Sequence, residues 1–92
     1  MKFEWSDEKS KKSYLKHGVD FEEAQTVFRD ASALEYFDAL HSVDEDRLVR
    51  VGFSERGRIL VVIYCEREIE LIRIISARTA TKMEMVIYEK RI

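Results

Sequence analysis

The sequence predicts an α+β domain in which helices pack on one small antiparallel sheet, with the element order β-α-α-β-β-β-α. Two observations carry this prediction. Three segments rich in β-branched residues follow one another after residue 46, and the connections between them have only four residues, which is typical of antiparallel hairpins. Helix-capping patterns occur before residue 30 and again after residue 80, on both sides of these segments. Consecutive strands flanked by helices favour the α+β class.

The N-terminal part of the chain predicts one short strand and two helices. Residues 2–5 alternate polar and apolar side chains, as a strand does. Residues 6–18 begin with a serine that can cap a helix, carry basic side chains in the last turn, and end in glycine. Asp20 and Glu23 have the spacing of a capping box, so we expect a second helix that ends near Asp30.

The rest of the chain predicts the sheet and a last helix. Residues 33–37 can form an extra short strand, and residues 38–46 are typical of an exposed acidic loop. The three main predicted strands are Arg47–Phe53, Arg58–Tyr64 and Ile69–Ile75. The second of them is apolar on both faces, so we expect it in the middle of the sheet with both faces covered. Thr81 and Glu84 repeat the capping-box spacing and begin the last helix.

Length and charge limit the class of protein. Ninety-two residues, of which 46% are hydrophobic, indicate a single domain over residues 1–92. The 16 basic and 18 acidic side chains nearly cancel. Their distribution is uneven, because residues 1–46 carry 6 basic and 12 acidic side chains whereas residues 47–92 carry 10 and 6. The basic half favours a ligand that bears phosphate groups.

Export and membrane insertion are not predicted. The longest apolar run, Ile59–Cys65, has seven residues, far fewer than the roughly 20 that span a bilayer. The N-terminus lacks the hydrophobic core of a signal peptide. Cys65 is the only cysteine, so no disulfide can form within the chain. We therefore expect a cytoplasmic protein without contact with a membrane.

Several common catalytic groups are missing from the sequence. His17, His41 and Cys65 do not have the spacing of metal ligands, so we expect neither a metal site nor another cofactor. Gly52 and Gly57 lack the lysine that follows the glycines of a nucleotide-binding P-loop. The remaining candidates are the arginines of the basic half, because a guanidinium group binds phosphate oxygens in a bidentate way.

Two arginines in the last part of the sheet are candidate site residues. Arg73 shares one face of its predicted strand with Ile69, Leu71 and Ile75, so it must be paired or lie at a cleft. A structural ion pair is an equally good interpretation, and its candidate partners are Glu22, Glu23 and Glu84. Arg78 follows in the predicted turn before the last helix, where solvation alone would also explain it.

Two further side chains are candidates for proton transfer. His17 ends the first predicted helix, and histidine ordinarily titrates near neutrality, which suits general acid or base catalysis. A histidine is also simply favourable at a helix C-terminus. Tyr88 follows the basic turn by a few helical residues and could present its hydroxyl to the same cleft.

Six short motifs in order along nearly the whole chain carry a family resemblance. They are Lys2-Phe-Glu-Trp5, Lys16-His-Gly18, Phe21-Glu-Glu-Ala24, Gly57-Arg58, Arg73-Ile-Ile-Ser-Ala-Arg78 and Ala80-Thr81. Together they make the chain resemble the BrnT family of type II toxin–antitoxin toxins. The resemblance implies a RelE-like fold, an endoribonuclease that arrests translation, and a BrnA-type antitoxin that neutralises it. It also implies that operator DNA is bound only through the antitoxin.

For such a ribonuclease, metal-independent cleavage needs a group that takes the 2′-hydroxyl proton, a donor for the leaving 5′-oxygen, and fixed positive charge around the phosphate. We hypothesise that Arg73 and Arg78 clamp the phosphate, and that His17 or Tyr88 transfers the proton. The side chains expected to assist by binding the RNA are Lys16 and Arg58. The expected substrate is messenger RNA.

A second function remains open at this point. The chain could be a non-catalytic interaction module that binds an antitoxin and modulates the binding of operator DNA, its arginines forming salt bridges with the partner or contacts with phosphates. In either case we expect the partner to lay carboxylates over the arginines. Complex formation should then weaken with added salt.

Overall fold

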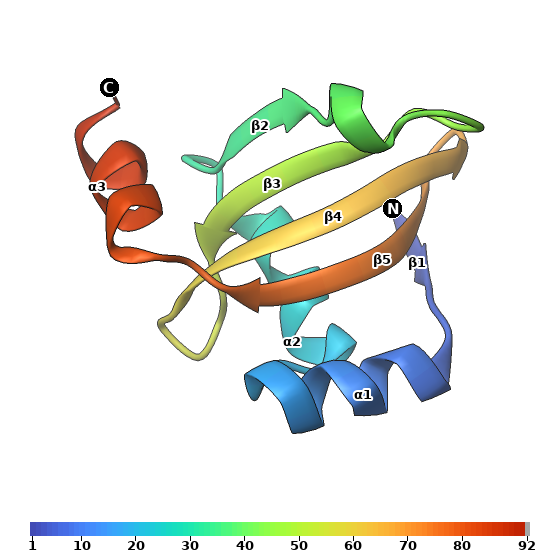
Figure 1. The fold of residues 1–92 in the computed structure, drawn as a ribbon, viewed down its shortest axis with the longest axis horizontal. Coiled ribbons are helices and arrows are strands. Elements are labelled where there is room, and N and C mark those ends of the chain that lie inside the picture. The colour runs from blue at the N-terminus through green and yellow to red at the C-terminus, as the bar shows by residue number, and fades with distance from the viewer. Residues whose placement is uncertain (92) are drawn as a thin grey trace.

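The computed structural model describes residues 1–91, which form a five-stranded sheet with helices packed on it (Figure 1). The strands are β1 (Lys2–Glu4), β2 (Leu34–Phe37), β3 (Leu48–Phe53), β4 (Ile59–Glu68) and β5 (Leu71–Thr79). The helices are α1 (Asp7–His17), α2 (Phe21–Gln25) and α3 (Lys82–Lys90), with short 3-10 helices η1 (Thr26–Arg29) and η2 (Ala39–His41). The predicted α+β fold and element order are confirmed, and the extra strand at 33–37 forms as β2.

The strands lie in the spatial order β1-β5-β4-β3-β2. The pairings from β2 to β5 are antiparallel as predicted, but β1 joins β5 in parallel. Strand direction here could not be predicted from a local pattern, because β1 and β5 lie at opposite ends of the chain. Within the described residues β1 pairs with Leu71–Arg73, at the start of β5. The remaining edge of β5 is therefore left to face α1, which packs against it.

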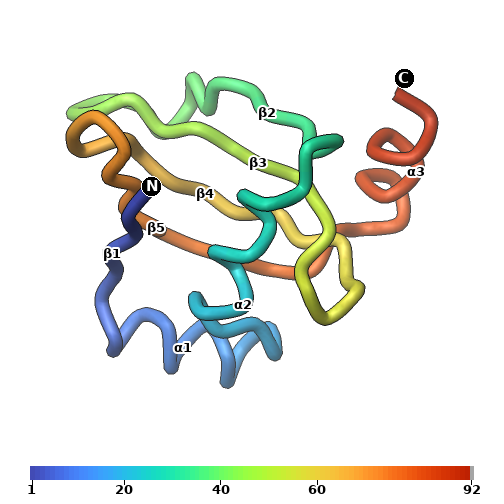
Figure 2. The backbone as a smooth tube through the Cα atoms, turned by 180° about the vertical axis from the view of Figure 1, so that it is seen from behind, coloured from blue at the N-terminus to red at the C-terminus, as the bar shows by residue number. Residues whose placement is uncertain are grey.

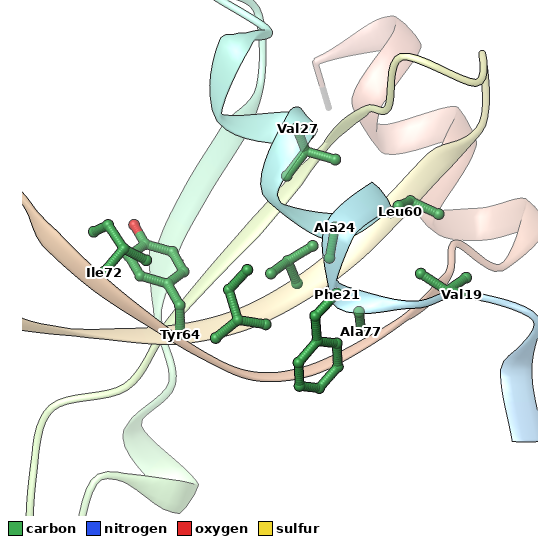
Figure 3. Packing of buried hydrophobic residues seen from close by; sticks show 10 residues of the cluster. Val19, Phe21, Ala24, Val27, Leu60, Tyr64, Ile72 and Ala77 are labelled. Atoms are coloured by element: carbon green, nitrogen blue, oxygen red, sulfur yellow. The ribbon is translucent and has the colours of Figure 1, made fainter. Parts of the chain in front are cut away.

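The core has two parts, one on each face of the sheet. α2 covers one face and α1 lies along the β5 edge of the sheet, as the view from behind shows (Figure 2), and α3 lies at the end of the opposite face. The first part, between α2 and the sheet (Figure 3), contains Val19, Phe21, Ala24, Val27, Leu60, Val62, Tyr64, Ile72, Ile74 and Ala77. The second contains Val49, Val51, Ile59, Val61 and Tyr88. β4 contributes to both parts, which agrees with the prediction that both of its faces are covered.

α1 is attached to the rest of the molecule by polar contacts. Its N-cap is Ser6, and Gly18 ends it with a φ of 72°, in the left-handed region that glycine adopts without strain. The buried side chains of α1, all of whose residues are described, are the two serines Ser10 and Ser13. Ser10 Oγ accepts a hydrogen bond from the Phe21 N–H at 2.8 Å. Ser13 Oγ lies 2.6 and 3.0 Å from the carbonyl oxygens of residues 19 and 77, so it ties α1 to β5.

The β4–β5 hairpin is longer than predicted. The sequence indicated a connection at Cys65–Glu68 and a strand from Ile69, but the ladder continues to Glu68, and the turn is at Ile69 and Glu70. Glu70 has a φ of 65°, in the left-handed region that is uncommon for residues other than glycine. The end of β4 resembles a loop in the sequence because Glu66, Arg67 and Glu68 are consecutive charged residues and all of them are exposed.

A β-bulge in β5 determines where its arginines point. Tyr64 pairs with Ile74 and Ile63 pairs with Ser76, so Ile75 is an extra residue in β5. Strict alternation would place positions 73 and 78 on opposite faces of the sheet. Because of the bulge, Arg73 lies opposite Cys65 and Arg78 opposite Val61, which puts both arginines on the same face. Arg78 is thus a strand residue and not, as predicted, a turn residue.

The second predicted helix changes character part-way. α2 ends at Gln25, and the chain continues as the 3-10 helix η1 to Arg29, so helical structure ends near Asp30 as predicted. The expected capping box forms only in half, because Asp20 accepts the Glu23 N–H but the Glu23 carboxylate turns elsewhere. No helix within residues 1–91 is long and apolar enough to cross a membrane.

Candidate functional site

A groove of about 360 Å³ runs between α1 and the free edge of β5, two elements that face each other in Figure 1. Its rim carries basic side chains, namely Lys9, Lys12, Lys16, His17 and Arg78. Its floor is mainly apolar and includes Phe21, Val61, Ile63, Ile75 and Ala77. The residues that line it include no acidic side chain. We call it the cationic groove; such a lining suits a phosphate that carries an apolar or aromatic group.

The helical repeat of α1 brings three lysines to the groove. Lys9, Lys12 and Lys16 are spaced by three and four residues, so they lie along one side of the helix. In the described part of the chain, Lys12 forms an exposed ion pair with Glu8 at 3.2 Å, whereas Lys9 and Lys16 form none. The prediction included Lys16 but missed the other two, although their spacing within the predicted helix was a usable signal.

Arg78 enters the groove from β5 and is held by α3. Its Nη1 and Nη2 donate to the two carboxylate oxygens of Glu84 at 2.7 and 2.9 Å. Glu84 is itself fixed, because it forms the predicted capping box with Thr81 at the start of α3. The hydrogen bonds from Arg78 lower the pKa of Glu84 to about 2, and the same contact raises the pKa of Arg78. The guanidinium is therefore a fixed positive charge at the groove.

Glu84 should make the stability of the protein depend on pH in the acid range. Its folded pKa of about 2 lies below the ordinary 4.5, so the stabilisation is complete above about pH 4.5 and is lost as the pH falls towards 2. The shift corresponds to about 3 kcal/mol, which we reduce to about 2 kcal/mol because the pair is partly exposed. Urea denaturation of the wild type and Glu84→Gln should therefore differ by this amount at about pH 7 and converge towards about pH 2. A difference that is constant with pH would contradict the assignment.

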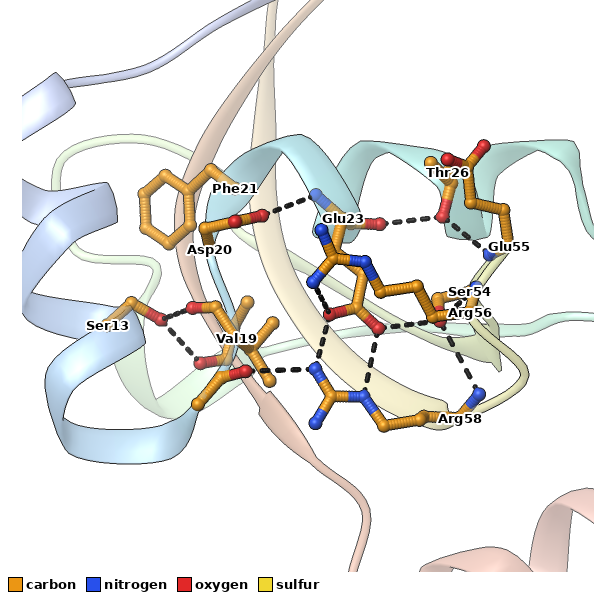
Figure 4. A network of polar contacts seen from close by, with 12 residues as sticks. Ser13, Val19, Asp20, Phe21, Glu23, Thr26, Ser54, Glu55, Arg56 and Arg58 are labelled. Carbon is orange, nitrogen blue, oxygen red and sulfur yellow. Dashed lines mark hydrogen bonds and ion pairs between the residues drawn. The ribbon is translucent and has the colours of Figure 1, made fainter.

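Arg58 lies beside the cationic groove but is engaged by a buried carboxylate (Figure 4). Its Nε donates to Glu23 Oε2 at 3.0 Å, its Nη2 contacts the other carboxylate oxygen, and Ser54 Oγ donates to Glu23 at 2.7 Å. Burial alone would raise the pKa of Glu23, but these hydrogen bonds outweigh it and the pKa is lowered. Arg58 also donates to the carbonyl of Gly18 at 2.9 Å, so it supports the end of α1 next to His17.

Arg73 does not reach the cationic groove. Its Nη1 pairs with Glu4 Oε2 at 2.9 Å, and these residues are direct neighbours in the parallel pairing of β1 with β5. Of the two predicted environments of Arg73, an ion pair or a cleft, the structure shows the ion pair. None of the three predicted partner residues is involved, because the sequence did not indicate that β1 joins this edge of the sheet.

Tyr88 also lies away from the cationic groove, contrary to expectation. It is the buried residue of α3 and packs against the sheet, and its hydroxyl donates to Asp30 Oδ2 at 2.5 Å. Burial and this hydrogen bond raise the pKa of Tyr88 to about 12. Asp30 also accepts the N–H groups of Phe53 and Ser32. The hydroxyl therefore anchors α3 to the sheet and is a poor group for proton transfer in the groove.

Of the six predicted site residues, the structure brings together Lys16, His17 and Arg78 at the cationic groove. Arg58, Arg73 and Tyr88 lie outside its lining. Residues 1–91 contain no group of three or more His, Cys, Asp or Glu side chains arranged to hold a metal ion. The groove thus combines one imidazole, one fixed guanidinium and three lysine ammonium groups.

Comparison with known proteins points to one family. A family model described as the ribonuclease toxin BrnT of a type II toxin–antitoxin system matches residues 5–84. The chain is similar to the crystal structure of the Brucella abortus ribonuclease toxin BrnT, with a TM-score of 0.68 and 26% sequence identity over 89% of this chain and 99% of that chain. No curated protein sequence matches the chain significantly. The matched region contains every residue that lines the cationic groove.

Proposed function

Because the chain belongs to the BrnT family of type II toxin–antitoxin ribonuclease toxins, we propose that it cleaves RNA endonucleolytically in the cationic groove. The observation that carries the proposal is the meeting of His17 and Arg78 with three lysines in a groove without an acidic lining residue. Concentrated positive charge attracts the phosphate backbone, and the apolar floor offers a place for a base. The proposed substrate is messenger RNA in the cytoplasm, whose loss inhibits translation.

The proposed reaction uses the 2′-hydroxyl of the substrate as the nucleophile. The neutral imidazole of His17 takes the hydroxyl proton, and the 2′-oxygen attacks the adjacent phosphorus in line with the 5′-oxygen. The bond from phosphorus to the 5′-oxygen breaks, which leaves a 2′,3′-cyclic phosphate, and a lysine ammonium protonates the leaving oxygen. Arg78 stabilises the charge that develops on the pentacoordinate phosphate. Side chains supply the base, the acid and the fixed charge, so we propose a metal-independent reaction.

We assign supporting roles to the four remaining predicted residues. Arg58 supports the turn that follows His17, through its hydrogen bond to the Gly18 carbonyl. Lys16 binds the RNA backbone at the rim, next to His17. Arg73 and Tyr88 act structurally, through their contacts with Glu4 and Asp30.

The proposed partner is a cognate antitoxin of the BrnA type that neutralises the ribonuclease. Membership of a type II toxin–antitoxin family supports the existence of this partner. We propose that operator DNA is bound through the antitoxin, because the net charge of the chain is -2 and does not favour DNA binding by the toxin alone.

One observation favours a second candidate function, a non-catalytic module that binds the antitoxin. Arg58, Arg73 and Arg78 each pair with a carboxylate of the chain itself, which reduces the charge available to a substrate phosphate. The two functions differ in a direct assay. A purified chain that leaves RNA intact but binds its antitoxin would be a module of this kind.

Replacing His17 with alanine should abolish toxicity and RNA cleavage. Because general base catalysis contributes about 100-fold to 10,000-fold, we expect a loss of at least about 100-fold in the cleavage rate. The test is induction of the chain in a bacterial host without its antitoxin, followed by cleavage of RNA by the purified protein in the presence of a chelator. The wild type should arrest growth and cleave RNA with the chelator present.

A matched histidine provides the control for this variant. His41 lies in the exposed loop, paired with Asp38 at 3.0 Å and outside the lining of the cationic groove. His41→Ala should keep full activity, and both variants should unfold at the temperature of the wild type. Equal cleavage by His17→Ala and the wild type would remove His17 from the mechanism.

A further inference from the structure

A second groove lies on the other side of α1 and differs from the cationic groove in charge. It has a volume of about 530 Å³ and is bounded by α1, the end of β1 and the start of α2. Its lining includes the carboxylates Asp7, Asp20 and Glu22, and Lys11 is its single basic residue. In the described chain none of these three carboxylates forms an ion pair. We call it the acidic groove; it repels phosphates, so it is not part of the RNA site.

Exposed apolar side chains accompany this negative charge. Leu15 is 84% exposed and Tyr14 is 53% exposed, and both line the acidic groove together with Trp5. An exposed leucine on its own needs no explanation. Here, however, two bulky side chains and a tryptophan lie in one hollow beside unpaired charges, which is the composition of a protein interface, where aromatic and apolar anchors are surrounded by polar groups.

The fold explains the charges of this groove but not its apolar residues. Asp20 caps α2, and Asp7 lies in the first turn of α1, where the helix dipole favours it. Tyr14 and Leu15, in contrast, have no partner in the core, since α1 is attached to the sheet through its buried serines. The bulky apolar side chains of α1 are therefore free to contact another molecule.

We propose that the acidic groove is the docking surface of the cognate antitoxin, which would place an apolar side chain against Tyr14 and Leu15 and lysine or arginine side chains against the carboxylates. This inference rests on the proposed function for the existence of an antitoxin. A protein that binds operator DNA is rich in basic residues, so its chemistry complements this groove. The sequence had predicted an acidic partner over the arginines. Carboxylates of the chain itself already occupy Arg58 and Arg73, which lie outside the cationic groove, and this makes these arginines less favourable for an acidic partner.

Two variants of the acidic groove test the proposal against one variant of the cationic groove. Leu15→Lys and Glu22→Lys should each weaken binding of the purified antitoxin by at least about tenfold in titration calorimetry, since each adds a positive charge where a cationic segment must lie. Both should cleave RNA as the wild type does, because neither residue lines the cationic groove. Lys12→Glu, on the opposite side of α1, should bind the antitoxin with unchanged affinity.

The outcomes separate this inference from the proposed ribonuclease function. Wild-type affinity for both acidic-groove variants would overturn the proposal. A larger loss of affinity in Lys12→Glu would overturn it too and would place the antitoxin over the cationic groove. If the chain cleaves no RNA but the two acidic-groove variants lose the antitoxin, the docking surface is supported and the ribonuclease proposal fails.

Discussion

Replacing Arg58 with methionine should lower the free energy of unfolding by about 3 to 5 kcal/mol, because it leaves a buried carboxylate without its main partner. The side chain of Glu23 is 0% exposed, whereas that of Arg58 is 37% exposed, so the buried group is the carboxylate. After the substitution Glu23 would keep the Ser54 hydroxyl at 2.7 Å and Arg56 at 3.7 Å. These contacts compensate a buried charge poorly.

Two control variants make this prediction specific. The double variant Glu23→Gln with Arg58→Met removes both charges and should recover most of the loss, as expected for a buried pair. Arg29→Met breaks an exposed pair with Glu55, at 3.2 Å with both side chains more than half exposed, and should cost less than about 1 kcal/mol. Urea denaturation measures all three differences. A cost for Arg58→Met no larger than that for Arg29→Met would contradict the structural role of the pair.

The elements of this fold were predictable because their signals are local. A helix cap joins residues three or four positions apart, so Ser6, Gly18 and the pair Thr81–Glu84 indicated where α1 and α3 begin or end. The run of apolar residues in β4 is also a local signal, and it predicted that this strand lies at the centre of the sheet. Such patterns need no knowledge of the rest of the chain, and the structure confirms the element order that they predicted.

The course of β5 was less predictable because it depends on pairing between strands. The extra residue Ile75 exists only relative to the ladder with β4, and the turn at Ile69 and Glu70 follows from how far that ladder extends. The sequence therefore placed Arg78 in a turn, whereas the ladder with β4 includes it in β5, on the same face as Arg73. The parallel pairing of β1, which brings Glu4 to Arg73, is a contact between residues 69 positions apart in the chain.

The residues of the candidate site also differ in whether their positions follow from local sequence signals or from contacts between distant parts of the chain. The sequence offered Arg73 three candidate carboxylates, but its partner is Glu4, 69 positions away, and the partner of Arg58 is Glu23, 35 positions away. Tyr88 was expected at the cleft because of its place in the last helix, but that helix directs the hydroxyl to Asp30, away from the cationic groove. Lys9 and Lys12, by contrast, were locally predictable from helical spacing once α1 was assigned.

Replacing Arg78 with alanine should reduce the rate of RNA cleavage by about 100-fold to 1,000-fold, which is the usual effect of removing one preorganised donor from a developing negative charge. The guanidinium lies at the rim of the cationic groove, and its two contacts with Glu84, at 2.7 and 2.9 Å, hold it there before any substrate binds. Arg78→Lys should recover part of the rate, because lysine keeps the charge but not the two parallel hydrogen bonds. Cleavage should be measured at saturating RNA, below the unfolding temperature of each variant.

Arg73→Ala is the matched control, because it removes an arginine from the same strand and the same face, and breaks an ion pair of similar length with Glu4. Unlike Arg78, Arg73 does not line the cationic groove. If cleavage depends on the charge within the groove, Arg73→Ala should change the rate by less than about threefold. If it depends instead on the total charge of the sheet, both variants should lose activity equally, and this result would remove Arg78 from the phosphate site.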